Sequence, residues 1–548
     1  MSDGPLIVQS DRSVLLEVAH PDAESARREL AVFAELERAP EHIHTYRITR
    51  LGLWNARAAG HAAQEMLDVL ARWSRFPLPP SVVTDIRETV ARYGRLVLER
   101  EPDGQQRLVL RSSDRAVLTE VAGNRRIEPL LAGRRDPDSW VVEPWARGQI
   151  KQELLRVGWP AEDRAGYTDG TPHPIDLHED GWTLRPYQHE AVDAFVAGGS
   201  GVVVLPCGAG KTLVGAAAMA RTGTTTLILV TSTVSARQWR DELLARTGLT
   251  EEEIGEYSGD VRQVRPVTIA TYQILTARRR GQYAHLSLLD AMDWGLIVYD
   301  EVHLLPAPVF KLTADLQARR RLGLTATLVR EDAREADVFS LIGPKRYDAP
   351  WKQIEAQGFI APAACFEVRV DLPAAERLEY AAAPDEERYR LAASAPAKIG
   401  LARRIADRHR GEQILVIGQY LDQIDALAEE LDAPKITGAT PVEERERLYR
   451  EFRAGAIRLL VVSKVANFSV DLPDASVAIQ VSGSFGSRQE EAQRLGRLLR
   501  PKGPGVTASF YTVIARDTVD QDFAQNRQRF LAEQGYSYTI MDADQLAA

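Results

Sequence analysis

Val202-Val-Val-Leu-Pro-Cys-Gly-Ala-Gly-Lys-Thr212 decides the fold: an apolar β-branched run leads through a glycine-bearing turn into helical sequence. Glycines in such a turn let backbone N–H groups approach a phosphate, a lysine supplies a mobile positive charge, and a threonine hydroxyl is a ligand for Mg²⁺. The strict phosphate-loop pattern has glycine where Leu205 stands, so only its second half is matched. The residues expected to hold phosphate and Mg²⁺ are Gly208, Gly210, Lys211 and Thr212.

A second apolar run, Leu296-Ile-Val-Tyr299, leads directly into Asp300-Glu301-Val302-His303, about 90 residues after the lysine. A carboxylate at the end of a strand can hold Mg²⁺ beside phosphates, and a neighbouring one can orient or deprotonate an attacking water. We assign the metal role to Asp300 and the water role to Glu301. Acidic pairs at strand ends are often only structural, but their place downstream of a phosphate loop favours catalysis.

The same alternation of short β-branched runs with helical patterns extends over residues 184–347 and returns over residues 413–481. It predicts parallel sheets covered by helices. The expected fold class is α/β, with two tandem parallel-sheet domains, an α+β N-terminal accessory region and a small helical insertion in the second sheet domain. The expected domains are a helical accessory domain at 1–75, an α+β domain at 76–165, the first sheet domain at 166–349 and the second at 350–548, with the insertion at about 371–410.

Local patterns make three further predictions for the accessory region. The helical spacing of apolar residues predicts a helix over Asp22–Arg38. Alternation around the turn at Pro102-Asp-Gly104 predicts a β-hairpin over Arg95–Arg111, and Ala116–Val121 is expected as a third strand.

Composition narrows the class of protein. The 548 residues are 45% hydrophobic and 26% charged, which is typical of globular chains and predicts several domains. Two cysteines exclude a disulfide framework and a four-thiolate zinc site. A net charge of −9 does not exclude a local basic groove for nucleic acid. No membrane span or signal peptide is expected, and the predicted location is cytoplasmic.

Three motifs carry a resemblance to a known superfamily. Asp300-Glu-Val-His303, Gly323-Leu-Thr-Ala-Thr327 and Gln493-Arg-Leu-Gly-Arg-Leu-Leu-Arg-Pro501, in this order, resemble superfamily 2 helicases with two RecA-like domains. Two further stretches, Leu184-Arg-Pro-Tyr-Gln188 and Ser463-Lys-Val-Ala-Asn-Phe-Ser-Val-Asp-Leu-Pro473, are similar to XPB DNA repair helicases, here a bacterial member. The motifs cover residues 184–502.

The resemblance implies an ATP-dependent DNA helicase that moves 3′ to 5′ in DNA repair, with ATP and Mg²⁺ bound. It implies that Arg185 and Gln188 contact the adenine end of ATP. It also implies that Thr325, Thr327 and Gln493 couple the nucleotide site to domain movement. Residues 76–165 take the place of the family's damage-recognition region, and the insertion that of its thumb-like element.

The second sheet domain is expected to complete the nucleotide site. Arg497 and Arg500 are three residues apart and lie on one helix face, so both can reach across the cleft to developing phosphate charge. Asp471 is expected as a further contact on the nucleotide side, although Ser469 stands where many superfamily 2 motifs have glycine.

Helicases of this type hold the sugar–phosphate backbone with hydroxyls and amides at loop ends. The DNA contacts expected from the resemblance are Ser232, Thr233, Thr271, Tyr272, Ser463 and Lys464. The family's charged, strand-separating loop corresponds to Arg330, Glu331 and Asp332. Capping or turn roles for the first set, and a solvated loop for the second, remain open alternatives.

The expected partners are single-stranded or forked DNA and a nuclease or repair factor. One alternative is a double-stranded DNA translocase that remodels protein–DNA complexes without strand separation. Another is a non-catalytic scaffold that recruits a nuclease, which the intact catalytic motifs disfavour.

Overall fold

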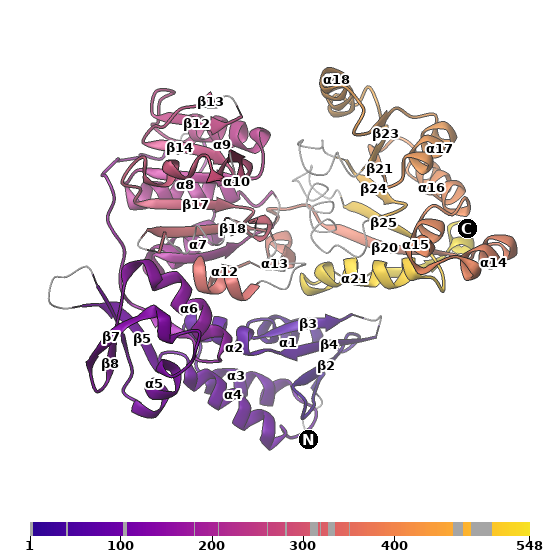
Figure 1. Ribbon diagram of the computed structural model, residues 1–548. Helices are drawn as coiled ribbons and strands as arrows, with labels where there is room; N and C mark the ends of the chain where they lie inside the picture. The colour runs from indigo at the N-terminus through magenta and orange to yellow at the C-terminus, as the bar shows by residue number, and fades with distance from the viewer. Residues whose placement is uncertain are drawn as a thin grey trace. The chain divides into compact units, whose positions relative to one another are not determined.

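The computed structural model describes residues 4–39, 42–101, 107–179, 181–206, 208–259, 261–279, 282–306, 309, 316–317, 319–326, 335–349, 351–463, 475–483, 507–536 and 538–547. The chain forms two compact units, one made mainly of residues up to Ala349 and the other mainly of the residues that follow. Each unit is organised around a large, mainly parallel sheet (Figure 1).

The sheet of the first unit has eight strands in the order β13-β12-β14-β11-β17-β18-β10-β19. All pairings are parallel except β12 with β13. Its elements are α7 Pro186–Gly198, β10 Ser200–Val204, α8 Lys211–Thr222, β11 Thr226–Val230, α9 Thr233–Arg246, β12 Ile254–Ser258, β13 Val261–Arg262, β14 Val267–Thr271, α10 Tyr272–Thr276, β15 Arg278–Arg279, β16 Gln282–Tyr283, η3 Leu286–Asp290, β17 Leu296–Asp300, η4 Val302–Leu304, β18 Arg320–Thr325, α12 Glu335–Leu341 and β19 Lys345–Asp348.

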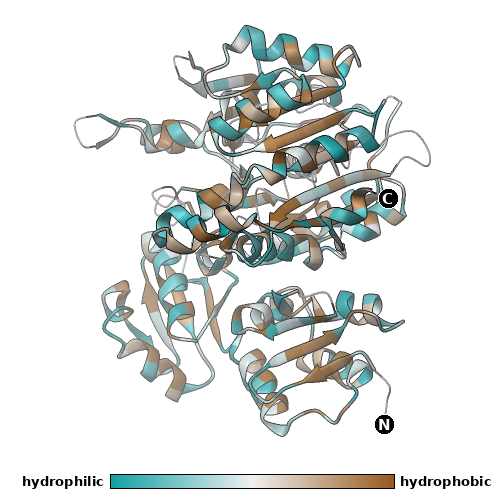
Figure 2. Cartoon of the chain, turned by 90° about the vertical axis from the view of Figure 1, so that its right-hand side faces the viewer, coloured by the Kyte–Doolittle hydropathy of each residue, from teal (hydrophilic) through white to brown (hydrophobic). Residues whose placement is uncertain are grey.

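The central strands of this sheet are buried on both faces, which explains their near-continuous apolar sequence. Val202, Leu227 and Ile297 are fully buried in one hydrophobic cluster. The hydropathy colouring shows the strands in brown, with teal residues on the flanking helices (Figure 2). Parallel pairing brings the carboxyl ends of β10, β11, β14, β17 and β18 to one edge of the sheet, where ligands bind in open α/β folds.

Two smaller sheets precede the eight-stranded sheet in the chain. One has the strand order β1-β2-β4-β3 and the other β7-β8-β6-β5-β9. Their elements are β1 Leu6–Val8, β2 Ser13–Glu17, α1 Ala23–Leu30, β3 Ala34–Arg38, β4 Ile43–Ile48, α2 Arg50–Ala58, α3 Ala63–Trp73, α4 Pro80–Arg92, β5 Leu96–Arg100, β6 Leu108–Arg111, α5 Arg115–Ala122, η1 Glu128–Leu130, β7 Leu131–Asp136, β8 Ser139–Val142, η2 Pro144–Ala146, α6 Arg147–Arg156 and β9 Ala161–Asp163.

The predicted hairpin is confirmed by the antiparallel pairing of β5 with β6, but three other expectations are wrong. The first 75 residues are not helical, because a four-stranded sheet lies among them. The helix expected over Asp22–Arg38 ends at Leu30, and its last residues form β3. Ala116–Val121 is part of a helix, since the Asp114 carboxylate accepts hydrogen bonds from the first amides of α5. An α+β accessory region is therefore the correct description.

A buried ionic cluster joins the accessory elements to the eight-stranded sheet. Arg147 and Lys151 both donate to the Asp163 carboxylate, with shortest distances of 2.8 Å. The guanidinium groups of Arg147 and Arg321 each lie over the Tyr167 ring, at 5.6 and 5.7 Å from its centroid. Arg321 belongs to β18, so this aromatic residue links the two parts through cation–π contacts.

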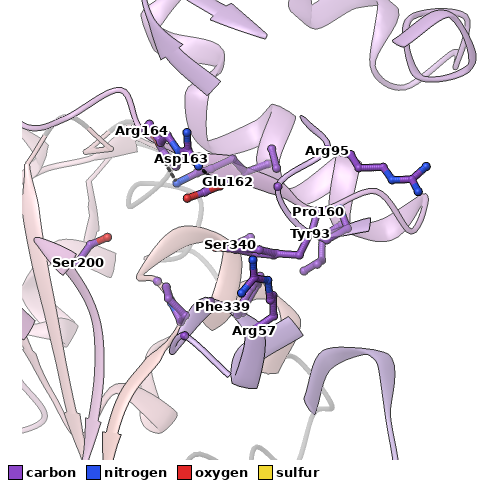
Figure 3. A pocket seen from close by; sticks show the side chains of 18 of the residues that line it. Arg57, Tyr93, Arg95, Pro160, Glu162, Asp163, Arg164, Ser200, Phe339 and Ser340 are labelled. Carbon is purple, nitrogen blue, oxygen red and sulfur yellow. Dashed lines mark hydrogen bonds and ion pairs between the residues drawn. The ribbon is translucent and has the colours of Figure 1, made fainter. Parts of the chain in front are cut away.

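A polar cleft of about 600 Å³ lies beside this cluster. Figure 3 shows Glu162, Asp163 and Arg164 on one side of it, Arg57 from α2 on another, and Phe339 and Ser340 from α12 below. Among the described residues, none of the predicted nucleotide contacts lines this cleft. The cleft is therefore distinct from the phosphate loop.

The second unit has seven parallel strands in the order β22-β23-β21-β24-β25-β20-β26. Its elements are α13 Trp351–Ala356, β20 Ala363–Val370, α14 Ala374–Ala382, α15 Asp385–Ala393, α16 Ala397–Arg408, β21 Ile414–Gly418, α17 Leu421–Leu431, β22 Lys435–Ile436, α18 Val442–Arg453, β23 Leu459–Ser463, β24 Val477–Gln480, β25 Ala508–Ala515, α21 Val519–Glu533, β26 Tyr538–Asp542 and η5 Ala543–Ala547. The predicted α/β class with two tandem parallel sheets is confirmed, and helices α14 to α16 occupy the expected insertion.

Among the helices that the structure describes, none combines the length and the apolar character needed to cross a bilayer.

Candidate active site

The turn between β10 and α8 has the backbone conformation that its glycines allow. Gly208 and Gly210 have φ angles of +80° and +81°. A side chain rarely adopts this region, whereas glycine enters it freely. Gly210 directly precedes α8, and no side chain in the described chain caps the first amides of that helix. These amides and the positive end of the helix dipole suit a phosphate.

The side chain of Gln188 closes one side of this turn. A Cβ atom at Gly210 would lie 2.4 Å from the Gln188 amide nitrogen, so glycine is required for the approach. Gln188 is 1% exposed, and its Oε1 accepts a hydrogen bond from the Arg185 amide at 2.8 Å. The predicted nucleotide residue Gln188 therefore lies directly against the phosphate loop, while Arg185 donates to the Tyr187 hydroxyl at 3.1 Å.

Lys211 and Glu301 meet at the carboxyl edge of the sheet. The Nζ atom of Lys211 lies 3.3 Å from Glu301 Oε1. Lys211 is the first residue of α8, and Glu301 directly follows β17. Glu301 has φ +48°, an unfavourable conformation for a residue with a side chain, and such strain concentrates at functional sites. The tertiary fold thus pairs the predicted phosphate-binding lysine with the predicted water-orienting carboxylate.

Asp300 is held by residues of α9 and α10 and by the amide of Glu301. Its Oδ2 accepts a hydrogen bond from Trp239 Nε1 at 3.0 Å, and its Oδ1 accepts one from the Glu301 amide at 3.1 Å. The Tyr272 hydroxyl donates to the Asp300 carbonyl oxygen at 2.8 Å. These bonds fix the carboxylate that the sequence predicts as the Mg²⁺ ligand.

His303 connects Glu301 to Thr325. Its Nδ1 lies 3.4 Å from Glu301 Oε2 and 2.6 Å from Thr325 Oγ1. Thr325 is fully buried at the end of β18, which pairs with both β17 and β10. One imidazole therefore lies between the predicted coupling residue and the predicted water-orienting carboxylate.

The two adjacent carboxyl groups differ in their electrostatics. Burial and the neighbouring Glu301 charge raise the pKa of Asp300 to about 6. Burial also opposes ionisation of Glu301, but the Lys211 and His303 charges outweigh it and hold the Glu301 pKa below its usual value. Glu301 is thus the carboxyl group that ionises more readily.

The structure tests several of the expected DNA contacts. Tyr272 is 2% exposed and its hydroxyl donates to the Asp300 carbonyl oxygen, so a DNA contact at this position stays a prediction that would involve the backbone amide. Thr271 and Ser463 are 5% and 4% exposed, which also argues against contacts through their hydroxyls. Ser232 Oγ accepts a hydrogen bond from the Ser235 amide and caps α9, as its alternative role predicts. Thr233 is exposed, and its DNA contact stays a prediction.

The remaining predicted site residues lie outside the described part of the chain. They are Thr327, Arg330, Glu331, Asp332, Lys464, Asp471, Gln493, Arg497 and Arg500.

Sequence reasoning missed the roles of two residues at this site. Trp239 lies on α9, and its ring occupies the space beside Gly215, where a Cβ would come within 2.4 Å of the indole. The separation of Trp239 from Asp300 in the sequence does not indicate that the two side chains are in contact. His303 is part of the quoted Asp-Glu-Val-His motif, and an imidazole two residues after the predicted water-orienting carboxylate is the signal that could have indicated its role.

Comparison with known proteins agrees with this geometry. Family models match residues 354–547 (ERCC3/RAD25/XPB C-terminal helicase), 181–330 (type III restriction enzyme, res subunit) and 6–136 (helicase conserved C-terminal domain). The DNA 3′-5′ helicase XPB of Kineococcus radiotolerans is 68% identical over 100% of this chain and 98% of its own length. The chain belongs to the XPB family of DNA helicases.

Two other XPB proteins show how far the similarity extends. The DNA 3′-5′ helicase XPB of Mycobacterium tuberculosis is 64% identical over 100% of this chain and 99% of its own. The general transcription and DNA repair factor IIH helicase/translocase subunit XPB of Antonospora locustae is 34% identical over 98% and 82%. The predictions of an XPB-type, ATP-dependent DNA 3′-5′ helicase are confirmed, and ATP use follows from membership of this family.

Proposed function

We propose that this XPB-family chain hydrolyses ATP at the β10–α8 turn and uses the energy to separate forked or single-strand-containing DNA during repair. The observation that carries the proposal is the row of close polar side chains Lys211, Glu301, His303 and Thr325, in which Glu301 and His303 lie at ion-pair distance. It joins a phosphate-binding lysine, a water-orienting carboxylate and the end of a neighbouring strand.

Each residue has a distinct role in the proposed reaction. Lys211 binds the phosphates of ATP and neutralises charge that develops on them, while Glu301 orients the attacking water. The close Lys211 and Glu301 side chains neutralise one another before ATP binds, so phosphate binding would release Glu301 for the water. Arg497 and Arg500 are proposed to act from the second sheet domain, and Asp471 to contact the nucleotide there.

The residues present also suit Mg²⁺. Thr212 in the first turn of α8 and the Asp300 carboxylate would hold it, and it would supply charge neutralisation at the phosphates. Trp239 and the Glu301 amide keep the Asp300 carboxylate in one orientation.

Lys211→Ala and Glu301→Gln test the proposal. We expect Lys211→Ala to abolish ATP hydrolysis in a folded protein, since the variant lacks the positive charge that binds and neutralises the phosphates of ATP. Glu301→Gln is expected to bind ATP and DNA but not to turn over. ATP turnover by either purified variant at the parental rate would overturn the assignment.

The strand-separating activity needs its own assay, because the same motifs serve a duplex translocase. A forked duplex with a labelled strand reports unwinding, and a triplex reports translocation along the duplex. We expect ATP-dependent release of the labelled strand from the fork, by an enzyme that moves 3′ to 5′. Triplex displacement without fork opening would instead establish the translocase.

The proposal extends to partners and place of action. The Antonospora locustae relative is named as the helicase/translocase subunit of general transcription and DNA repair factor IIH. We propose that this chain likewise acts with a protein partner, a nuclease or a repair factor, and that it meets DNA in the cytoplasm of a bacterial cell.

A further inference from the structure

A groove of about 530 Å³ lies on the second unit, away from the phosphate loop in sequence and built from α14, α15 and the start of α17. Leu372, Tyr380, Leu391 and Pro396 supply apolar surface. Leu372 is 6% exposed, and Tyr380 packs against the small cluster that contains it. The groove therefore has a fixed apolar floor.

Helix α14, which borders this groove, has no buried side chain within the described structure. Its nine residues lie at the periphery of the unit (Figure 1), and the Tyr380 hydroxyl anchors it by accepting a hydrogen bond from the Val519 amide at 2.9 Å. An isolated helix shorter than about 12 residues is marginal in water, because most helical stability comes from packing of one face. An exposed helix of this length gains stability when a partner covers it.

The two most exposed large apolar side chains of the described chain lie on the same helices. Leu378 in α14 is 73% exposed, and Leu421, the first residue of α17, is 62% exposed. Each directly precedes a groove residue, Glu379 and Asp422 respectively. Two strongly exposed apolar side chains thus lie on helices that border the groove, and exposed apolar surface is a feature of protein–protein contacts.

The rim of the groove is acidic. Glu376, Glu379, Glu387 and Asp422 line it, and Arg390 is the one cation among its lining residues. Arg390 is already paired with Asp422 at 3.0 Å. Glu376 Oε2 is shielded from solvent yet accepts no hydrogen bond from any described residue. Among the described residues, no cation pairs with Glu376, Glu379 or Glu387, so these rim carboxylates are available to a positively charged ligand.

We propose that this groove docks a basic amphipathic helix of a partner protein. Leucine-like side chains of that helix would fill the floor between Tyr380 and Leu391, and its lysines or arginines would pair with Glu376, Glu379 and Glu387. The acidic rim disfavours nucleic acid, because phosphates would meet carboxylates instead of counter-charges. The thumb-like insertion is on this view a protein-docking element and not a DNA contact.

A defined probe tests the proposal on the full chain. A fluorescein-labelled amphipathic peptide of leucine, lysine and alanine, with its leucines on one helical face, is titrated by anisotropy. A peptide with glutamate in place of lysine is the control ligand. We expect the lysine peptide to bind at least tenfold more tightly, and its affinity to fall at least tenfold in Glu379→Lys/Glu387→Lys, which is about 1.4 kcal/mol or more.

Glu443→Lys/Glu446→Lys provides the matched control variant. These glutamates are exposed on α18, outside the groove, and the charge change is the same. We expect this variant to bind the lysine peptide as the parent does. Equal weakening in both variants would reduce the effect to net charge and overturn the proposal.

Hydrogen exchange gives a second readout that does not depend on a variant. Amides of α14 are expected to exchange rapidly in the free chain and to become protected when the lysine peptide binds. Protection by forked DNA instead of the peptide would overturn the proposal in favour of a nucleic-acid contact.

DNA-stimulated ATP turnover is expected to be unchanged in Glu379→Lys/Glu387→Lys, and its loss would mean that the groove serves the ATPase cycle.

Discussion

Trp239 donates a hydrogen bond from its indole Nε1 to Asp300 Oδ2 at 3.0 Å, so a residue of α9 orients the carboxylate at the end of β17. The indole fits there because position 215 on α8 is glycine, where a Cβ would come within 2.4 Å of the ring. Two helices and one strand thereby determine the direction of one proposed Mg²⁺ ligand.

Trp239→Phe should raise the Mg²⁺ concentration needed for half-maximal ATP turnover. The variant keeps an aromatic ring but removes the donor, and a hydrogen bond to a charged group contributes about 1.5–3 kcal/mol. Titration of Mg²⁺ in a steady-state ATPase assay measures the shift. Trp294→Phe is the control, since Trp294 is also buried and donates to the Leu288 carbonyl at the other end of β17. A similar shift in both variants would contradict a specific role for Trp239.

Thr325→Val should uncouple DNA from ATP hydrolysis. The valine keeps the shape of threonine but cannot bond to His303, which lies 2.6 Å from the hydroxyl in the parent. We expect the DNA-stimulated rate to fall about tenfold or more with ATP affinity unchanged, since a loss of 1.4 kcal/mol is tenfold in rate. Thr325→Ser restores the hydroxyl and should restore the rate. Full stimulation in Thr325→Val would remove this hydroxyl from the coupling route.

Gly210→Ala should weaken ATP binding far more than Gly208→Ala. Both glycines have φ near +80°, so alanine costs a similar backbone strain of about 1–2 kcal/mol at each position. Only at position 210 does the new Cβ meet Gln188, at 2.4 Å, whereas no described atom lies within 4 Å at position 208. Fluorescent-nucleotide titration gives the two affinities. Gly210→Ala/Gln188→Ala should recover part of the loss, and no recovery would show that the contact is not the cause.

Asp163→Asn should destabilise the first unit much more than Lys151→Met. Asp163 is the one carboxylate that Arg147 and Lys151 share, so its loss leaves two buried cations unpaired, at a cost of about 3–5 kcal/mol. Removing Lys151 leaves the Arg147–Asp163 pair intact. Thermal unfolding of both purified variants provides the comparison. A larger loss in Lys151→Met would reverse our assignment of which charge is essential.

The same cluster predicts a pH dependence of stability. Burial lowers the pKa of Lys151 to about 8. The Asp163 charge opposes this shift but does not cancel it, because Arg147 shares the same carboxylate. The unfolded chain, with a lysine pKa near 10.5, holds more protons between about pH 8 and pH 10.5, so stability rises with pH across this window. The unfolding midpoint of the parent should therefore rise relative to Lys151→Met between pH 8 and pH 10. A constant difference would contradict the lowered pKa.

The sequence alone predicted the ATP-binding sheet because its signals are local. Val202–Thr212 contains a buried strand, a glycine turn and a helix start in one continuous segment, and Tyr299–Glu301 contains a strand end with its carboxylates. Buried parallel strands are apolar on both faces, so each can be predicted from its own sequence without knowledge of the strands beside it. The secondary structure of the accessory region was harder to predict. Ala116–Val121 is as apolar as a strand, and the Asp114 cap is the feature that favours a helix there.

The tertiary structure determined the contacts between site residues that are distant in sequence. The sequence by itself determined which chemistry is present: a lysine, two carboxylates and two glycines in a nucleotide-binding order. Only the fold decided that the Tyr272 hydroxyl donates to the Asp300 carbonyl oxygen, that Trp239 orients the Asp300 carboxylate, and that His303 contacts Thr325. The physical reason is that parallel pairing brings the ends of separate strands to one edge of the sheet, and the identity of the side chains that meet there depends on register and helix packing, which leave no periodic signal in the chain.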